Sequence, residues 1–152
     1  MAAVSLSTII DADIEHTFGV LADWRFNKVW ERELVEYEPV AGEERRFRWV
    51  RIVGGRRTEG ILEVTALEPP HRIEMAGPAG DMAFRSEITL RAQGERTRVV
   101  AEVALVPRGL ARLFDAMIER QLRRQATGNL QVLKALVEAT SLVRRPSLRS
   151  IG

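Results

Sequence analysis

The spacing of hydrophobic residues changes along the chain, and each change predicts a different kind of element. Residues 4–10 are rich in β-branched side chains, which favour a first strand. Asp11 or Asp13 can then cap a helix. The residues that follow show the three- and four-residue spacing of one buried helix face at Ile14, Phe18, Leu21 and Ala22. A second short helical stretch is predicted over residues 26–31.

From residue 34 to residue 106 hydrophobic and polar residues alternate, with a period of two. Glycine and proline pairs interrupt this region, and Gly54-Gly55 supplies the positive φ angles that a tight hairpin needs. Such alternation predicts antiparallel strands with one face covered and the other in water. On the strand before that hairpin, Phe47, Trp49 and Arg51 share a face.

A long helix is predicted to follow Pro107 and to end near Thr140. Its apolar residues keep three- and four-residue steps, and most of its arginines fall on the other side. Thirty residues in a helix span about 45 Å. Gly128 weakens this helix by about 1 kcal/mol relative to alanine, and it marks a bend or a close approach.

One α+β architecture accommodates this order of elements. A curved antiparallel β-sheet wraps around the long C-terminal helix, and two short N-terminal helices plug one end. Curving the sheet around the helix leaves a hollow between them unless large side chains fill it. We expect a single domain over residues 1–140, followed by a basic, mobile tail over residues 141–152.

Composition narrows the class of protein. The chain has 152 residues, of which 45% are hydrophobic and 29% charged, and it contains no cysteine. A disulfide scaffold, a thiolate metal site and a cysteine nucleophile are therefore excluded. The chain has no apolar run near the ~18–20 residues that a membrane span needs. Its first ten residues lack the basic start of a signal peptide, so we expect a cytoplasmic protein.

The formal net charge is only +2, but it is distributed unevenly. Residues 76–152 hold 13 basic and 7 acidic side chains. Of the 23 basic residues, 21 are arginine, a residue type that suits anion binding. A general arginine bias of the source genome also explains this choice and is the interpretation we favour. No aromatic residues alternate with these arginines as a stacking platform would require, so we expect no nucleic-acid partner. Peripheral contact with a membrane, a protein partner and the oligomeric state stay open.

Several segments resemble a known family. Asp13–Phe18 (DIEHTF), Leu21–Asp23 (LAD) and Trp30 are similar to the first helix and the tryptophan loop of the START-like superfamily, also called SRPBCC. Glu68–Ile73 (EPPHRI) resembles the proline-rich lead into a central strand of that family. Asn129–Glu138 (NLQVLKALVE) resembles the end of its C-terminal helix.

Bacterial members of this superfamily are often called polyketide cyclase/dehydrase and lipid-transport proteins. The resemblance covers residues 4 to about 140, and it implies the helix-grip fold with a cavity between sheet and helix. Because function depends on the site and not on the fold, the resemblance implies far less about chemistry.

Large apolar side chains at inward positions are candidates for the lining of that cavity. The predicted ligand-binding residues are Trp30, Phe47, Trp49, Met75, Phe84, Phe114 and Met117. Aromatic and other apolar walls of this kind suit an apolar ligand. For any one of these residues, ordinary core packing is the simpler interpretation.

Polar candidates are few. Arg51 shares the inward face of Phe47 and Trp49, so it must pair with an acidic group, meet a ligand, or reach solvent over the rim, and we favour the rim. Arg51 is also the candidate polar anchor for a ligand, and it is the eighth predicted ligand-binding residue. His16 lies two positions from Phe18 and is predicted to face away from the core, and His71 is also assigned to the surface. The two histidines lack metal-ligand spacing, so neither a metal nor another cofactor is expected.

No catalytic motif is present, whether a nucleophile elbow, a phosphate loop or a dinucleotide fingerprint. The predicted function is therefore binding of a hydrophobic or amphipathic small molecule, lipid-like or polyketide-like, in the internal cavity. A polyketide cyclase or dehydratase is the alternative, and it requires at least two polar residues that converge in the cavity within about 3 Å of a common point. Arg51, Ser86 and Tyr37 are the candidates, and the alternative is dropped if all three point outward. A third hypothesis is an interaction module that uses the basic helix face.

Overall fold

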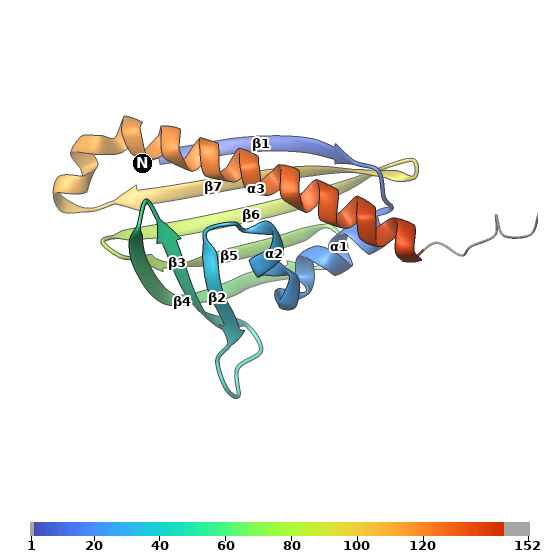
Figure 1. Ribbon diagram of the computed structural model, residues 1–152, viewed down its shortest axis with the longest axis horizontal. Coiled ribbons are helices and arrows are strands. Elements are labelled where there is room, and N and C mark those ends of the chain that lie inside the picture. Colours follow the sequence, from blue (N-terminus) through green and yellow to red (C-terminus); the bar gives the residue numbers. More distant parts are fainter. Residues whose placement is uncertain (1, 145–152) are drawn as a thin grey trace, which may run out of the picture.

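The computed structural model describes residues 2–144, in which a seven-stranded antiparallel sheet curves around one long helix (Figure 1). Neighbours in the chain are neighbours in the sheet, except that the first strand pairs with the last, which gives the order β1-β7-β6-β5-β4-β3-β2. The strands are β1 Ala2–Ile10, β2 Leu34–Pro39, β3 Arg46–Val53, β4 Arg56–Glu68, β5 Arg72–Ala79, β6 Met82–Gln93 and β7 Arg96–Pro107. Gly54 and Gly55 have the positive φ angles expected for the β3–β4 turn.

The N-terminal helices confirm the prediction in part. Helix α1 covers Ile14–Ala22, and Asp13 caps it by accepting a hydrogen bond of 2.7 Å from the His16 backbone N–H. The expected second helix is shorter, because a 3-10 turn, η1 (Trp24–Phe26), leads into a single α-helical turn, α2 (Asn27–Trp30). These elements plug one end of the curved sheet, as predicted.

The C-terminal helix starts later and ends later than predicted. A 3-10 segment, η2 (Gly109–Phe114), precedes helix α3 (Asp115–Arg144). The first four residues of the expected tail therefore continue the helix, and Ser141 among them is buried. The rest of that tail, residues 145–152, lies outside the described residues.

The core consists of two apolar clusters on the concave face of the sheet. The larger lies between α1, the last half of α3 and the strands β1, β5, β6 and β7, and includes Leu90, Leu133 and Val137. The smaller lies on β2, β3 and β4, where the rings of Tyr37 and Phe47 stack with centroids 5.0 Å apart. Partly buried side chains pack against both clusters, so the space between the clusters is where a cavity can form.

The predicted surface position of His16 is wrong. Its side chain is buried, and Nε2 lies 3.2 Å from the Val137 carbonyl oxygen and 2.9 Å from Thr140 Oγ1. The reason is that α3 crosses α1 here and covers a second face of the short helix. His71 is exposed, as expected, with Nδ1 3.3 Å from the Leu90 carbonyl oxygen.

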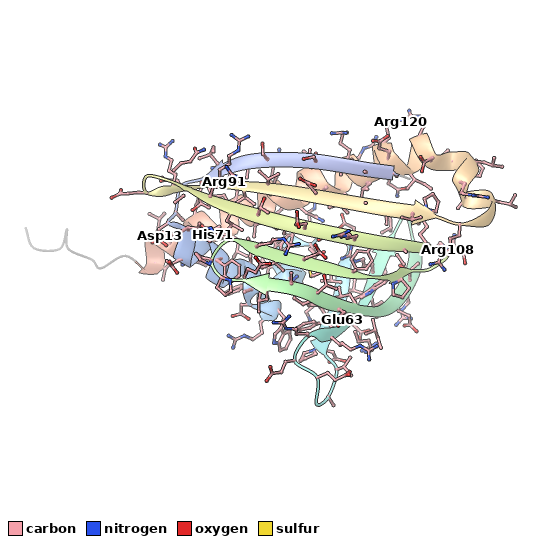
Figure 2. All side chains as sticks on the ribbon, turned by 180° about the vertical axis from the view of Figure 1, so that it is seen from behind. Asp13, Glu63, His71, Arg91, Arg108 and Arg120 are labelled. Carbon is pink, nitrogen blue, oxygen red and sulfur yellow. The ribbon has the colours of Figure 1, made fainter. Side chains whose placement is uncertain are left out.

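The convex face of the sheet is the wet face that the alternation predicts, and Figure 2 shows it. Arg72 forms ion pairs with Glu68, Glu74 and Glu87 at 2.6–2.7 Å. Arg85 also reaches Glu74 at 2.9 Å, and this hydrogen bond holds the pKa of the Glu74 carboxyl below its usual range. Charged side chains are therefore paired across neighbouring strands on this side.

Candidate functional site

Three adjoining pockets lie on the concave face of the sheet. The central pocket, of about 100 Å³, lies between α3 and strands β3 to β7, and its walls include Leu62, Ile88 and Leu130. The open-end pocket, of about 220 Å³, lies between the first turns of α3 and the ends of β3 to β7, beside Val53, Met82 and Ile118. The α2 pocket, of about 90 Å³, lies under α1, η1 and α2.

Shared side chains separate these pockets. Phe84 and Arg51 border both the central and the open-end pocket, whereas Trp30 and Met75 border both the central and the α2 pocket. Each volume alone is small beside the ~300–1,000 Å³ of common small-molecule sites.

The structure places six of the eight predicted ligand-binding residues on these walls. Trp30 and Met75 line the central and the α2 pocket, and Phe84 and Arg51 line the central and the open-end pocket. Phe47 lines the α2 pocket, and Trp49 lines the open-end pocket. They come from α2, β3, β5 and β6, so residues distant in sequence meet on one concave surface.

Phe114 and Met117 lie elsewhere. Their exposed fractions are 53% and 58%, and they line none of these three pockets. They belong to η2 and the first turn of α3, which extend past the part of the sheet that covers the rest of the helix. One helical turn further on, Ile118 and Gln121 do line the open-end pocket, so the two exposed side chains lie beside its rim.

Arg51 points inward and does not reach over the rim. Its Nη2 donates a hydrogen bond of 2.7 Å to Glu31 Oε1, and its guanidinium carbon lies 5.6 Å from the centre of the Trp49 ring. The second carboxylate oxygen of Glu31 accepts a hydrogen bond of 2.9 Å from Asn27 Nδ2. The ion pair is mostly buried, with side-chain exposures of 30% for Arg51 and 12% for Glu31.

Further polar groups line the central pocket. Ser86 lies on its sheet wall, and Gln125 and Asn129 lie on its helix wall. Asn129 is held by two contacts, because its Nδ2 donates to Glu33 Oε2 at 3.0 Å and its Oδ1 accepts from the Arg32 backbone N–H at 3.2 Å. The cavity is therefore more polar than the sequence analysis indicated.

Sequence reasoning missed Glu31, Gln125 and Asn129. The two helix residues interrupt an apolar stripe that continues through Leu122 and Leu133, and polar residues on such a stripe are a signal that could have been used. Glu31 follows a helix of one turn, and no local pattern shows that its side chain crosses to β3.

Tyr37, the single tyrosine of the chain, is buried in the wall of the α2 pocket. Burial raises the pKa of its hydroxyl group, and the negative charge of Glu31 raises it further, while the positive charge of Arg51 lowers it. The hydroxyl group lies 4.0 Å from Met75 Sδ. Tyr37 is therefore a neutral phenol at physiological pH, able to donate a hydrogen bond.

The two buried tryptophans differ in their surroundings. The Trp49 ring packs against Gly60 on the neighbouring strand. A Cβ atom added at Gly60 would come within 2.8 Å of Trp49 Cζ2. Trp30 separates two pockets and is 8% exposed. Among the described residues, no acceptor meets the indole N–H of either ring. Since a buried donor without a partner is costly, a ligand acceptor would be stabilising near Trp30.

Other candidate sites are weaker. A groove of about 470 Å³ lies on the convex face, between β1, β6 and β7, where Arg85, Glu87 and Glu102 border it. In the part of the chain that the structure describes, histidine and acidic side chains form no group of three that could hold a metal. No helix within residues 2–144 has the length and the apolar character needed to cross a bilayer.

Comparisons with known proteins agree with this geometry. The family described as polyketide cyclase/dehydrase and lipid transport matches residues 1–138. No curated protein sequence matches the chain. Among solved structures, TTHA0849 from Thermus thermophilus is 23% identical, with a TM-score of 0.79, over 91% of this chain and 99% of that one.

Two further solved structures have the same fold. A START superfamily protein from Mycobacterium smegmatis is 14% identical, with a TM-score of 0.77, over 92% of this chain and 99% of that one. The ZhuI aromatase/cyclase from a Streptomyces species is 17% identical, also with a TM-score of 0.77, over 90% of this chain and 93% of that one. At these identities the likeness concerns the fold.

Proposed function

Because this chain belongs to the START-like polyketide cyclase/dehydrase and lipid transport family, we propose that it binds a hydrophobic or amphipathic small molecule between α3 and the concave face of its sheet. The observation that carries the proposal is the row of three adjoining pockets, whose walls are mostly apolar. Adjoining apolar pockets with a few polar groups on their walls are typical of sites that bind small molecules.

Six residues are proposed to contact the ligand. Trp30, Phe47, Trp49, Met75 and Phe84 supply apolar area, and Arg51 orients the polar end. Phe114 and Met117 border the entrance instead. The driving force is burial of the ligand's apolar surface, at about 25 cal/mol for each Å² removed from water.

The open-end pocket is the proposed entrance. It lies between the hairpin that joins β3 to β4, the hairpin that joins β5 to β6, and the first turns of α3. Phe84 stands between this pocket and the central pocket, so a change in its side-chain rotamer would extend the cavity inward. Loops and helix ends of this kind move more readily than packed strands.

Filling the central pocket tests the proposal. Ala126 lines this pocket from α3, so Ala126→Phe places a ring inside it. Ala135→Phe makes the same change at an exposed position of the same helix and is the control. We expect the neutral fluorescent probe N-phenylnaphthylamine to bind the parent protein and the control, and to bind Ala126→Phe at least ~10-fold more weakly.

Circular dichroism establishes that each variant is folded before binding is measured. Equal affinity for the probe in the parent protein and in Ala126→Phe would refute binding in this cavity. Native mass spectrometry of the freshly purified protein adds an independent measurement, because a retained small molecule appears as a mass increase that Ala126→Phe reduces.

A cyclase-type enzyme is the second candidate, and one observation favours it. Arg51 and Ser86 line the central pocket and Tyr37 lines the neighbouring α2 pocket, so two of the polar groups that this activity requires share one pocket. The test is turnover of a synthetic poly-β-ketone, followed by mass spectrometry. A cyclised product that Arg51→Met abolishes would establish the activity, and equal product with the parent protein and with buffer would exclude it for that substrate.

A further inference from the structure

We propose that Glu31 makes the cavity selective for ligands whose polar group is uncharged, because its carboxylate already neutralises Arg51. This inference rests on the proposed function and specifies the chemistry of the ligand. An unpaired arginine on an apolar pocket wall would attract a carboxylate or a phosphate. An arginine that already has a buried acidic partner does not offer the same attraction.

The charges around the pocket support this assignment. Glu31 and Arg51 are the charged side chains among the described residues that line the central pocket, and Arg51 is the one at the open-end pocket. They are joined at 2.7 Å, so their charges cancel locally. An entering anion would lie beside Glu31 as well as Arg51, and repulsion from the carboxylate would offset the attraction of the guanidinium group.

Displacing Glu31 from Arg51 is also unfavourable. Both carboxylate oxygens are engaged, one by Arg51 and the other by Asn27, and the side chain is only 12% exposed. An anion that took its place on Arg51 would leave a mostly buried carboxylate without its cationic partner. Breaking a mostly buried pair in this way is unfavourable, because it leaves an uncompensated charge away from water.

A neutral polar group meets no such penalty. A guanidinium group carries five N–H donors, and Glu31 accepts a hydrogen bond from Nη2 alone, so other donors can face the pocket. Ser86, Gln125 and Asn129 add uncharged donors and acceptors to the same walls. The geometry therefore fits a ketone, hydroxyl or amide on an otherwise apolar molecule.

The test compares dodecanol with dodecanoate as competitors of bound N-phenylnaphthylamine, at a pH where the acid is ionised. The measured quantity is the ratio of the two inhibition constants. This ratio is compared between variants, because the difference in water solubility between the two competitors is the same for every variant and cancels. We expect the parent protein to prefer dodecanol. Glu31→Gln should shift the ratio toward dodecanoate by about 10-fold or more, since a charge-assisted hydrogen bond to Arg51 becomes available.

Two further variants complete the experiment. Glu36→Gln removes a carboxylate that is half exposed and pairs with Arg48, so this control should keep the parent ratio. The double variant Glu31→Gln with Arg51→Gln has no charge at the site, and it should return the ratio to a preference for dodecanol. If Glu31→Gln alone does not fold, the preference of the parent protein between the two competitors still tests the inference.

The outcomes separate the two claims. An unchanged ratio in Glu31→Gln, or a parent protein that prefers dodecanoate, overturns the selectivity inference and leaves ligand binding intact. If neither competitor nor the probe binds any folded variant, the proposed function itself fails.

Discussion

The last half of α3 and the η2 segment before the helix both carry apolar residues but lie in different surroundings. Leu133 and Val137, in the last half, are completely buried against β1, α1 and the sheet. Leu110 and Leu113, in η2 just before the helix, are 80% and 77% exposed. Figure 1 shows why, since η2 and the first turns of α3 extend past the end of β7, whereas the last turns lie over α1.

This contrast separates what holds the fold from what serves the cavity. The closed end of the molecule, where α1 meets the last half of α3, contains the larger apolar cluster. The open end, at η2, carries exposed apolar side chains beside the open-end pocket, and Figure 2 shows Arg108 and Arg120 at this end. A rigid closed end and a loosely covered open end suit a protein that must admit a ligand without unfolding.

The largest effect is expected from leucine truncation at the two ends. Leu133→Ala should lower the free energy of unfolding by about 2–5 kcal/mol, because it leaves a cavity in the closed core. Leu113→Ala removes the same atoms from an exposed side chain, so it should change the free energy of unfolding by less than about 0.5 kcal/mol. Urea unfolding followed by circular dichroism measures both. Similar losses at the two positions would show that η2 is covered in solution.

The two histidines repeat this comparison with polar side chains. His16→Ala removes a buried ring that contacts the Val137 carbonyl and the Thr140 hydroxyl, so we expect a loss of about 1–3 kcal/mol. His71→Ala, at an exposed position, should cost about 0.5 kcal/mol or less. Thermal unfolding of the two variants under identical conditions gives the difference. A larger loss for His71→Ala would contradict the assigned role of His16 in joining α1 to α3.

Local patterns were enough to predict the sheet, because alternation along β3 to β7 directly reports which face is covered. They were not enough for His16, since its burial depends on a helix more than 120 residues later in the chain. The same limit applies to Phe114 and Met117. Their spacing marks an apolar helix face, but only the length of the sheet determines whether that face is covered.

The candidate site shows a similar division. Trp49 and Phe84 could be placed on the cavity wall from strand alternation alone. The partner of Arg51 could not, because Glu31 lies 20 residues earlier and reaches β3 through the tertiary fold. Side chains that act in pairs across elements are therefore the part of the site that a sequence reveals least.

Tyr37 lies in the wall of the α2 pocket, and its ionisation tests how well this wall is shielded from solvent. Its pKa is raised in the folded protein, so the neutral phenol is favoured there, while an unfolded tyrosine ionises near pH ~10. The stabilisation is therefore complete below about pH 10 and is lost as the pH rises above it. In Tyr37→Phe, the free energy of unfolding should no longer show this decrease above about pH 10.

Absorbance of the tyrosinate ion measures the same property directly, since the chain has one tyrosine. In the folded protein the signal should appear only above the pH at which a model tyrosine ionises, and unfolding in urea should return it to the ordinary range. A native titration that matches the model compound would mean that solvent reaches the α2 pocket freely.

The smallest effect is expected from two helical glycines. A Cβ at Gly19 of α1 would meet nothing within 4 Å, so Gly19→Ala should stabilise the protein by about 0.5–1 kcal/mol. A Cβ at Gly128, between the two halves of α3, would lie 3.2 Å from Arg32 Nη1. Arg32 is exposed and its end can swing away, so Gly128→Ala should also stabilise, by up to about 1 kcal/mol.

The sign of the change at Gly128 indicates how firmly the middle of α3 is held. Higher stability in both alanine variants means that the Arg32 side chain moves aside, and that α3 packs only loosely against the segment after α2. A gain at Gly19 with a loss at Gly128, measured by urea unfolding, would mean that the crossing cannot adjust. The boundary between the closed and the open end would then be a rigid contact, and opening for a ligand would have to occur entirely within η2 and the turns of α3 that precede Gly128.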